Sequence, residues 1–344
     1  METRENVITF GRPPLDTLRR PIHDLRISVM DRCNFRCPYC MPRETFHESY
    51  RFLKSSERLD FAEILRLARV FVRAGVRKIR ITGGEPLLRR GLVDIVARTT
   101  SLDPRPEVSL TTNGIGLARS AAALKEAGLD RVNVSLDTVD AETFQKLTRR
   151  DRLKDVLAGL QAAHDAGLTP VKVNAVLMRG VNDADAPQLL EFCLERGYEL
   201  RFIEQMPLDA QHGWDRTTMI TADEILGMLT ERFHLTPDDA SKRGSAPAES
   251  FLVDGGPRTV GIIASVTRPF CGDCDRVRLT ADGQVRDCLF ARTESDLRSA
   301  LRAGADDAEL ADRWRRAMLN KLPGHGINDP SFLQPARPMS AIGG

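Results

Sequence analysis

Between His23 and Met206 the chain alternates short runs of β-branched residues with longer segments of helical periodicity. This alternation is typical of βα units, whose strands pair in parallel. The six predicted strands are Leu25–Met30, Arg77–Thr82, Val108–Thr112, Arg131–Leu136, Val171–Leu177 and Leu200–Glu204. A closed barrel needs eight such units. The sequence therefore predicts an α/β fold built on a partial (β/α)6 TIM-type barrel.

One helix in this region has clear boundary signals. Asp60 and Glu63 are spaced as a capping pair, apolar residues follow at helical spacing, and Gly75 is placed to end the helix. A second stretch with the same periodicity precedes Gly167. These signals support the assignment of helices between the strands.

The pattern changes after Met206. We expect a helix at Thr221–Phe233, a loop at Thr236–Ala248, antiparallel strands at Ser250–Val253, Thr259–Val266 and Arg276–Thr280, and helices at Glu294–Ala303 and Asp307–Leu319. The stretch from Pro323 onward should lack regular structure. We therefore predict an N-terminal extension (1–20), the barrel (21–206), a C-terminal α+β domain (207–322) and an irregular tail (323–344) that ends in Gly-Gly.

Charge and composition narrow the class of protein. The 344 residues carry a formal net charge of +2 and are 42% hydrophobic, which argues against disorder and against a basic nucleic-acid-binding protein. No uncharged stretch approaches the roughly 20 residues of a membrane span, and the first residues do not resemble a signal peptide. We expect a cytoplasmic protein that binds neither membrane nor nucleic acid.

Six of the seven cysteines form two groups of three. Cys33, Cys37 and Cys40 are spaced C-x-x-x-C-x-x-C, whereas the second group has the pattern C-x-x-C followed by a distant cysteine, at Cys271, Cys274 and Cys288. The remaining Cys193 lies on an apolar helical face and is interpreted as a buried, inert thiol.

Three thiolates need a soft metal partner, either zinc or an iron–sulfur cluster. Structural zinc takes a fourth protein ligand, and neither group offers an obvious one, because His47 is the nearest histidine after the first group and no histidine lies between Val260 and Asp312. On a four-iron cluster, three cysteines leave one iron open for a small molecule. The first spacing favours such a cluster, whereas zinc remains an alternative for the second group.

Polar residues alternate with apolar ones along the predicted strands. Because the apolar set must pack against the helices, the polar set should point into the barrel. That set comprises Arg26, Lys78, Arg80, Ser109, Thr111, Asn133, Ser135, Lys172 and Arg201. Five cations without matching acids indicate an anionic ligand such as a polyphosphate. A strand phase shifted by one residue would reverse this orientation.

Several motifs resemble the radical S-adenosylmethionine superfamily. They are the first cysteine group, with Tyr39 before its last cysteine, and the Gly-Gly-Glu-Pro run at Gly83–Pro86. Further motifs narrow the resemblance to the GTP 3',8-cyclase family of molybdenum cofactor biosynthesis. They are Asp24–Ser28, Arg80–Leu87, Thr111–Gly114, Asn133–Asp137, Lys172–Asn174, Arg201–Glu204, Cys271–Arg278 and the terminal Gly343 and Gly344.

The resemblance implies two 4Fe-4S clusters, one on each cysteine group, and S-adenosylmethionine as cofactor. The residues implied as contacts of S-adenosylmethionine are Tyr39, Gly84, Glu85, Ser135 and Met206. Those implied for GTP are Arg26, Arg80, Thr111, Lys172, Arg201, Arg276, Val277 and Arg278. Those implied for catalysis are Arg26, Arg276, Arg278, Gly343 and Gly344, the last two in a tail that reaches the active site.

In the family, a hydrogen atom is removed from ribose C3′ of GTP and the carbon radical attacks guanine C8. The product is (8S)-3',8-cyclo-7,8-dihydroguanosine 5'-triphosphate, which passes to cyclic pyranopterin monophosphate synthase. A monomer or a homodimer is expected, and the reductant is not specified by the sequence. Two alternatives remain: a radical enzyme with an auxiliary cluster that modifies a peptide, and a non-catalytic zinc protein.

Overall fold

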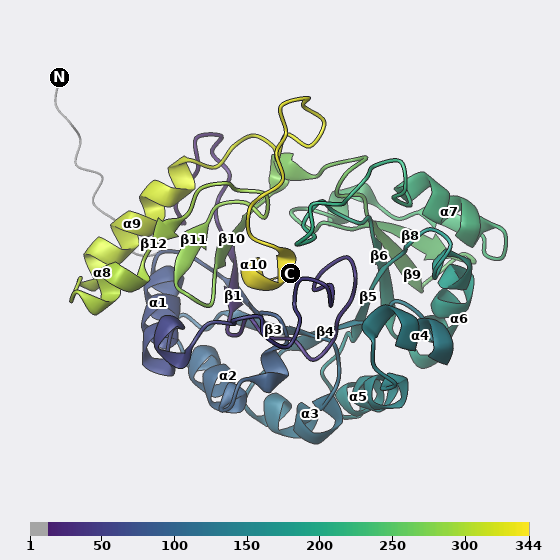
Figure 1. Cartoon of the computed structure of the whole chain (residues 1–344), viewed down its shortest axis with the longest axis horizontal. Coiled ribbons are helices and arrows are strands. Elements are labelled where there is room, and N and C mark those ends of the chain that lie inside the picture. Colours follow the sequence, from purple (N-terminus) through teal and green to yellow (C-terminus); the bar gives the residue numbers. More distant parts are fainter. Residues whose placement is uncertain (1–12, 344) are drawn as a thin grey trace.

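The computed structural model describes residues 13–343 and contains an arc of six parallel strands with helices on its outer side (Figure 1). The strands are β1 (Asp24–Ser28), β2 (Lys78–Thr82), β3 (Glu107–Thr112), β4 (Arg131–Ser135), β5 (Lys172–Val176) and β6 (Glu199–Ile203). They pair in chain order. All six predicted strands are confirmed, with bounds that differ by at most two residues.

The helices that cover this arc are α1 (Phe61–Arg73), α2 (Leu92–Thr100), α3 (Leu117–Glu126), α4 (Ala141–Thr148), α5 (Leu153–Asp165) and α6 (Ala186–Arg196). The predicted capping pair is confirmed in α1. Asp60 accepts a hydrogen bond from the backbone N–H of Glu63, and the Glu63 carboxylate accepts one from the N–H of Asp60, both at 2.8 Å. These bonds satisfy amides that the first helical turn leaves free.

Strands from the C-terminal half extend the sheet at both edges. They are β7 (Leu235–Pro237), β8 (Glu249–Val253), β9 (Thr259–Ile263), β10 (Arg276–Leu279), β11 (Gln284–Arg286) and β12 (Ser295–Asp296). The order across the twelve strands is β12-β11-β10-β1-β2-β3-β4-β5-β6-β9-β8-β7. The C-terminal half therefore completes the same sheet from two sides.

The predicted antiparallel pairing is correct for β8 with β9, whereas β10 does not join them and is antiparallel only to β11. Strand β10 lies at the opposite end of the arc, parallel to β1, with Arg26 opposite Arg278. Its Val277 and Leu279 are buried, as the equivalent positions of β1 are. The alternation within a strand identifies its buried face but not its neighbour, so the sequence pattern did not distinguish these partners.

The remaining helices are α7 (Ala222–Thr230), α8 (Arg298–Arg302), α9 (Asp307–Leu319) and α10 (Met339–Ile342). The prediction for α9 is confirmed, α8 is shorter than predicted because β12 occupies its first residues, and the predicted loop contains the short strand β7. The tail is not wholly irregular, since α10 forms a single turn. The four-part division of the chain remains a prediction.

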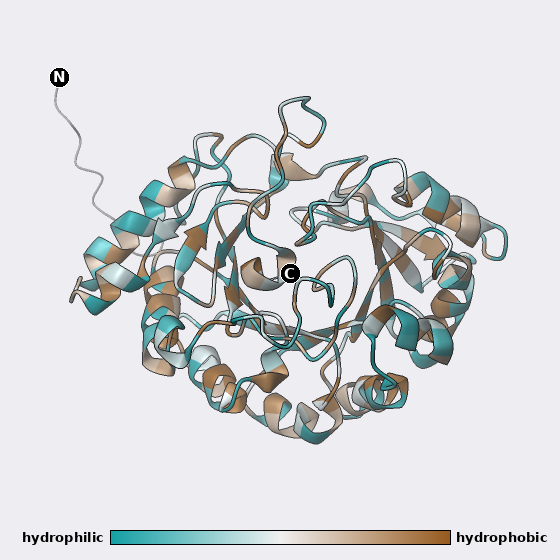
Figure 2. Ribbon diagram, in the orientation of Figure 1, coloured by the Kyte–Doolittle hydropathy of each residue, from teal (hydrophilic) through white to brown (hydrophobic). Residues whose placement is uncertain are grey.

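The main hydrophobic core lies between the sheet and the helices. Leu25 and Ile27 of β1 are almost fully buried, as are Ile64 and Phe71 of α1. At the outer edge, Trp314 of α9 packs against Phe71 with their ring centroids 4.7 Å apart. In Figure 2 the helices are divided between hydrophilic and hydrophobic sides. This arrangement leaves the inner side of the sheet for polar residues.

None of the helices in the described part of the chain has the length and apolar character required to cross a membrane. At the mouth of the arc, α10 lies inside the ring of strands (Figure 1). The last turn of the tail thus occupies part of the space that the strands surround.

A candidate active site inside the partial barrel

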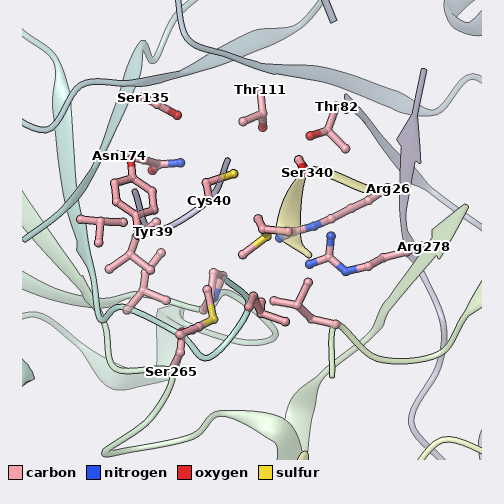
Figure 3. Close-up of a pocket in the computed structure, with 18 of the residues that line it drawn as sticks. Arg26, Tyr39, Cys40, Thr82, Thr111, Ser135, Asn174, Ser265, Arg278 and Ser340 are labelled. Carbon is pink, nitrogen blue, oxygen red and sulfur yellow. The ribbon is translucent and has the colours of Figure 1, made fainter. Parts of the chain in front are cut away.

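Both cysteine groups line one cavity of about 320 Å³ inside the arc of strands. Cys33, Cys37 and Cys40 reach it from the loop after β1, and the second group reaches it from the segments that flank β10 and β11. In Figure 3, Cys40, Tyr39, Arg26 and Arg278 extend into the same space from different elements. The fold thus places the two groups, which are separated by more than 200 residues, at a common site.

The thiols of the first group are half-buried at the cavity wall. Burial raises the pKa of Cys33 to about 11 and that of Cys40 to about 12, and it also raises the pKa of Cys37. The Cys33 sulfur accepts hydrogen bonds from the Phe35 N–H at 3.4 Å and from Asn113 Nδ2 at 3.6 Å. Thiols in such an environment become thiolates when a metal binds them.

The second group lies among cations. Burial raises the pKa of Cys274, but Lys321 and Arg276 lower it, so the net shift is downward. In residues 13–343, no three His, Cys, Asp or Glu side chains converge on a single metal ion. The fit to metal clusters therefore rests on the thiol chemistry and on the shared cavity.

The two glycines after β2 run against the loop that precedes the first cysteine group. The N–H of Gly84 donates to the carbonyl of Met30 at 2.7 Å. A Cβ on Gly84 would lie 2.4 Å from the carbonyl oxygen of Arg32, and one on Gly83 would lie 2.4 Å from that of Met30. Only glycine permits this approach, and it brings the backbone at Gly84 to the cavity wall.

Glu85, expected as a contact of S-adenosylmethionine, does not line the cavity itself. Its side chain is fully buried and accepts hydrogen bonds from Thr112 Oγ1 at 2.7 Å, from the Asn113 N–H at 2.7 Å and from the Leu87 N–H at 2.9 Å. Burial raises its pKa to about 7. The carboxylate thus connects the segments that follow β2 and β3.

Tyr39 contacts a buried acid that the sequence analysis did not select. Its hydroxyl donates to Asp137 Oδ2 at 2.7 Å, and the Val176 N–H donates to Oδ1 at 2.9 Å. Burial raises the pKa of Asp137 to about 6, although Tyr39 opposes the shift. Its position directly after the predicted strand β4, at the carboxyl end where α/β folds bind ligands, was the available signal.

Most of the predicted inward cations do point inward. Arg26, Arg80 and Arg201 line the cavity together with Arg276 and Arg278. Thr111, Ser135 and Met206 lie on the same wall. The predicted strand phase is therefore correct.

Two of the predicted inward cations do not reach the cavity. Lys78 is exposed at the start of β2, and Lys172 Nζ forms an ion pair with Glu199 Oε2 at 2.5 Å. Val277 also turns away, because it alternates with the two arginines of β10 and is buried in the core. Lys78 and Lys172 are each the first residue of their strand, and neither lines the cavity.

The arginines are not wholly without acids, contrary to the sequence analysis. Asp24 is the first residue of β1. The positive charges of four arginines act on its carboxyl group: Arg26, Arg80, Arg276 and Arg278. Although burial raises the pKa of Asp24, these cations lower it below its usual value. Asp275 also acts on Arg26 and Glu199 acts on Arg201, so five arginines are met by three carboxylates and positive charge remains in excess among these groups.

Several arginines are buried without full hydrogen bonding. Burial lowers the pKa of Arg201 to about 10 and holds the pKa of Arg80 well below its usual value. Within the described residues, the Nε atoms of Arg26, Arg80 and Arg201 have no hydrogen-bond partner. Buried guanidinium groups with free donors are suited to an anion that carries several oxygen atoms.

The tail closes one side of the cavity. Met339 and Ser340 of α10 line it, and Arg278 Nη1 donates to the carbonyl of Gly343. Gly343 has φ +88°, and a Cβ there would lie 3.0 Å from Thr82 Cγ2 and 3.1 Å from Ser28 Cβ. Gly344 lies outside the described residues.

Comparisons with known protein families and relatives identify the family of this chain. Residues 27–193 match the radical SAM superfamily model and residues 198–327 match the model for Molybdenum Cofactor Synthesis C. The chain is 62% identical to the GTP 3',8-cyclase of Streptomyces coelicolor over 331 residues, 96% of both chains. It is 58% identical to the GTP 3',8-cyclase of Mycolicibacterium smegmatis over 337 residues, 96% of this chain and 92% of that one. The chain belongs to the GTP 3',8-cyclase family.

Solved structures support the fold of this GTP 3',8-cyclase family member. Streptococcus suis SuiB bound to S-adenosylmethionine has a TM-score of 0.59 at 14% identity, with 92% of this chain and 75% of SuiB covered. At this identity the likeness concerns the fold alone. Family membership brings the 4Fe-4S cluster and S-adenosylmethionine of radical SAM enzymes, and the GTP 3',8-cyclase name implies an additional C-terminal cluster.

Proposed function

We propose that this chain converts GTP to (8S)-3',8-cyclo-7,8-dihydroguanosine 5'-triphosphate, the first step of molybdenum cofactor biosynthesis. The observation that carries the proposal is the single cavity lined by both cysteine groups and by five arginines, in a chain 62% identical to a GTP 3',8-cyclase. The cavity contains two groups of thiols that can bind a soft metal, together with arginines that can bind an anion.

Cys33, Cys37 and Cys40 would hold the cluster that binds S-adenosylmethionine, and Cys271, Cys274 and Cys288 would hold the second. When bound, these groups supply an electron and a radical that abstracts hydrogen. Tyr39, Gly84, Ser135 and Met206 line the cavity and are proposed contacts of S-adenosylmethionine. Glu85 is proposed to support that site indirectly, through the loops that it fastens together.

Arginines on neighbouring strands would bind GTP. Arg26 and Arg80 face each other across β1 and β2, and Arg26 and Arg278 do so across β1 and β10. Such a row of guanidinium groups suits a triphosphate, and Thr111 adds a hydroxyl on the same wall. Arg201 and Arg276 complete the proposed set of GTP contacts. Lys172 is included as a supporting residue that pairs with Glu199. Val277 could contact GTP only through its backbone, because its side chain is buried.

The tail would exclude water from the reacting ribose and guanine. Arg278 is proposed to act in catalysis together with Arg26 and Arg276, and its bond to the Gly343 carbonyl holds the end of α10. Gly344 is proposed to act with Gly343. Enclosure of this kind protects a radical from side reactions.

We infer that the protein acts in the cytoplasm as a monomer or homodimer. Its product would pass to cyclic pyranopterin monophosphate synthase, and a one-electron reductant would be required.

Anaerobic turnover tests the proposed function. Protein reconstituted with iron and sulfide is incubated with S-adenosylmethionine, dithionite and GTP, and 5′-deoxyadenosine and the cyclised nucleotide are quantified. We expect both products in equal amounts only when GTP is present. Formation of 5′-deoxyadenosine without a change in GTP would refute the proposal.

The peptide-modifying alternative is not favoured. SuiB shares the fold, but its 14% identity contrasts with the 62% identity to a GTP 3',8-cyclase. The row of arginines also suits a triphosphate better than a peptide.

A further inference from the structure

Lys321 is a buried cation at the second cysteine group. It follows the end of α9, is 3% exposed and lines the cavity. Its Nζ donates to the carbonyl of Arg276 at 2.9 Å and to that of Asp287 at 2.5 Å. Arg276 is two residues after Cys274 and Asp287 directly precedes Cys288. One ammonium group therefore joins the two segments that present these cysteines.

The charge of Lys321 has only partial compensation from the protein. Both hydrogen-bond acceptors of its Nζ are neutral backbone carbonyls, and in the described part of the chain no carboxylate forms an ion pair with it. Arg20 is a contrasting case, since it also contacts this region but pairs with Asp16 at 2.5 Å. Burial of a cation without an anion is unfavourable. The surroundings of Lys321 are therefore suited to an anionic occupant.

Lys321 lines the same cavity as all three thiols of the second group. Its Nζ is hydrogen-bonded to the backbone two residues after Cys274 and directly before Cys288. The ammonium group is thus close to the whole donor set rather than to one cysteine. A cluster bound by these three thiolates would experience the same charge.

We propose that Lys321 is a positioning residue that ties the cysteine-bearing segments together and raises the reduction potential of the C-terminal cluster. Addition of an electron makes a cluster more negative, and a fixed positive charge nearby favours that reduced state. The inference rests on the C-terminal cluster of the proposed function but concerns a residue outside the substrate and thiol set assigned above.

The test uses the full chain with Cys33, Cys37 and Cys40 replaced by serine, so that only the C-terminal cluster remains. Lys321→Met removes both the charge and the hydrogen bonds, Lys321→Gln removes the charge and keeps a donor, and Lys321→Arg keeps the charge. Lys125→Met is the matched control, because Lys125 also donates to a backbone carbonyl, that of Gly167 at 2.8 Å, but is exposed and away from the cavity. Iron content, circular dichroism and the midpoint potential from an EPR-monitored titration are measured.

We expect the equilibrium constant for reduction to fall about tenfold in Lys321→Met and Lys321→Gln, a shift of about 59 mV to lower potential for one electron. Lys321→Arg and Lys125→Met should remain near the parent value. Unchanged potential in Lys321→Gln, with about four iron atoms retained, would overturn the inference and leave the proposed function intact.

Cluster loss is also decisive. If the fold is retained but Lys321→Met and Lys321→Gln lose the iron that Lys321→Arg keeps, the positive charge is required and the inference is supported. Loss of iron in all three variants would overturn the role of charge. A parent chain that binds no iron would instead remove the C-terminal cluster, and with it the proposed function.

Discussion

Glu85 is a buried carboxylate held by three neutral donors. Its pKa is raised by burial to about 7 from a usual 4.5. Between these two pH values the folded protein keeps a proton on Glu85 that the unfolded chain loses. The contribution of Glu85 to the free energy of unfolding is therefore largest below about pH 4.5 and decreases as the pH rises to about 7. We expect Glu85→Gln to weaken this decline, measured anaerobically as the difference in unfolding temperature between about pH 5 and about pH 8.

The exposed Glu48 provides the control for this measurement, since Glu48→Gln should keep the pH dependence of the native chain. Asp137 has the same direction of shift, so the decline should be reduced rather than abolished. An unchanged pH dependence in Glu85→Gln would contradict the assignment of a raised pKa to Glu85.

The bond between Tyr39 and Asp137 gives a second prediction for single residues. Tyr39→Phe removes the hydroxyl that stabilises the Asp137 carboxylate, so the pKa of Asp137 should rise above about 6. We expect the pH profile of S-adenosylmethionine cleavage to move to higher pH while iron content stays constant. Tyr198→Phe serves as control, because the Tyr198 ring contacts His164 and Phe192 away from the cavity. Identical profiles for Tyr39→Phe and the native chain would exclude this coupling.

Sequence patterns predicted the cavity's cysteines and arginines better than its carboxylates. Cysteine spacing is local, and strand alternation assigns Arg26, Arg80 and Arg201 to one face. The positions of Glu85 and Asp137 depend on loops that meet only in the folded chain. The pairing of Lys172 with Glu199 likewise depends on how β5 and β6 align.

At the level of elements, the depth of a residue along its strand separates binding cations from supporting ones within β1–β6, whereas in β10 the first residue, Arg276, already lines the cavity. Arg80 in the middle of β2 lines the cavity, whereas Lys172 begins β5 and pairs with Glu199. We expect Arg80→Ala to weaken GTP binding by about 2–5 kcal/mol and Lys172→Ala by about 1 kcal/mol or less. Calorimetric titration of GTP into anaerobic protein measures both. Equal losses would mean that Lys172 also contacts the nucleotide.

Helix α10 gives a second prediction at this level. At Gly343 the positive φ and the closeness of Thr82 and Ser28 leave little space for a side chain. We expect Gly343→Ala to displace the end of α10, break its bond to Arg278 and reduce turnover at least tenfold, while S-adenosylmethionine binding is retained. Gly227→Ala in α7 is the matched control, because a Cβ there meets nothing within 4 Å. Full turnover in Gly343→Ala would contradict a closing role for α10.

The elements themselves were largely predictable, but their order in the sheet was not. Capping residues and periodicity define α1 and α9 from local sequence. The parallel pairing of β10 with β1 joins residues some 250 positions apart, and no local pattern specifies that contact. The cavity depends on this pairing, because it brings Arg276 and Arg278 beside Arg26.

At the scale of the whole molecule, the segment before β1 and the segment after α9 meet at the second cysteine group. Arg20 precedes β1, yet its guanidinium donates to the carbonyl of Cys271 at 2.7 Å and to that of Leu322 at 2.7 Å. Its Nε pairs with Asp16 at 2.5 Å, and both side chains are buried. The residues before the barrel thus fasten the loop that presents Cys271 to the start of the tail. The sequence analysis assigned no role to this N-terminal extension.

Arg20→Met tests whether this connection stabilises the molecule. It would leave Asp16 as a buried, uncompensated carboxylate, which costs about 3–5 kcal/mol, and it would free two carbonyls at the second cysteine group. We expect a lower unfolding temperature and selective loss of iron from the C-terminal site, measured by calorimetry and iron analysis. Arg313→Met breaks an exposed pair with Glu309 and should cost about 1 kcal/mol or less. Equal effects of the two variants would show that the N-terminal segment does not brace the second cysteine group, and the tail would then depend on its contacts inside the barrel alone.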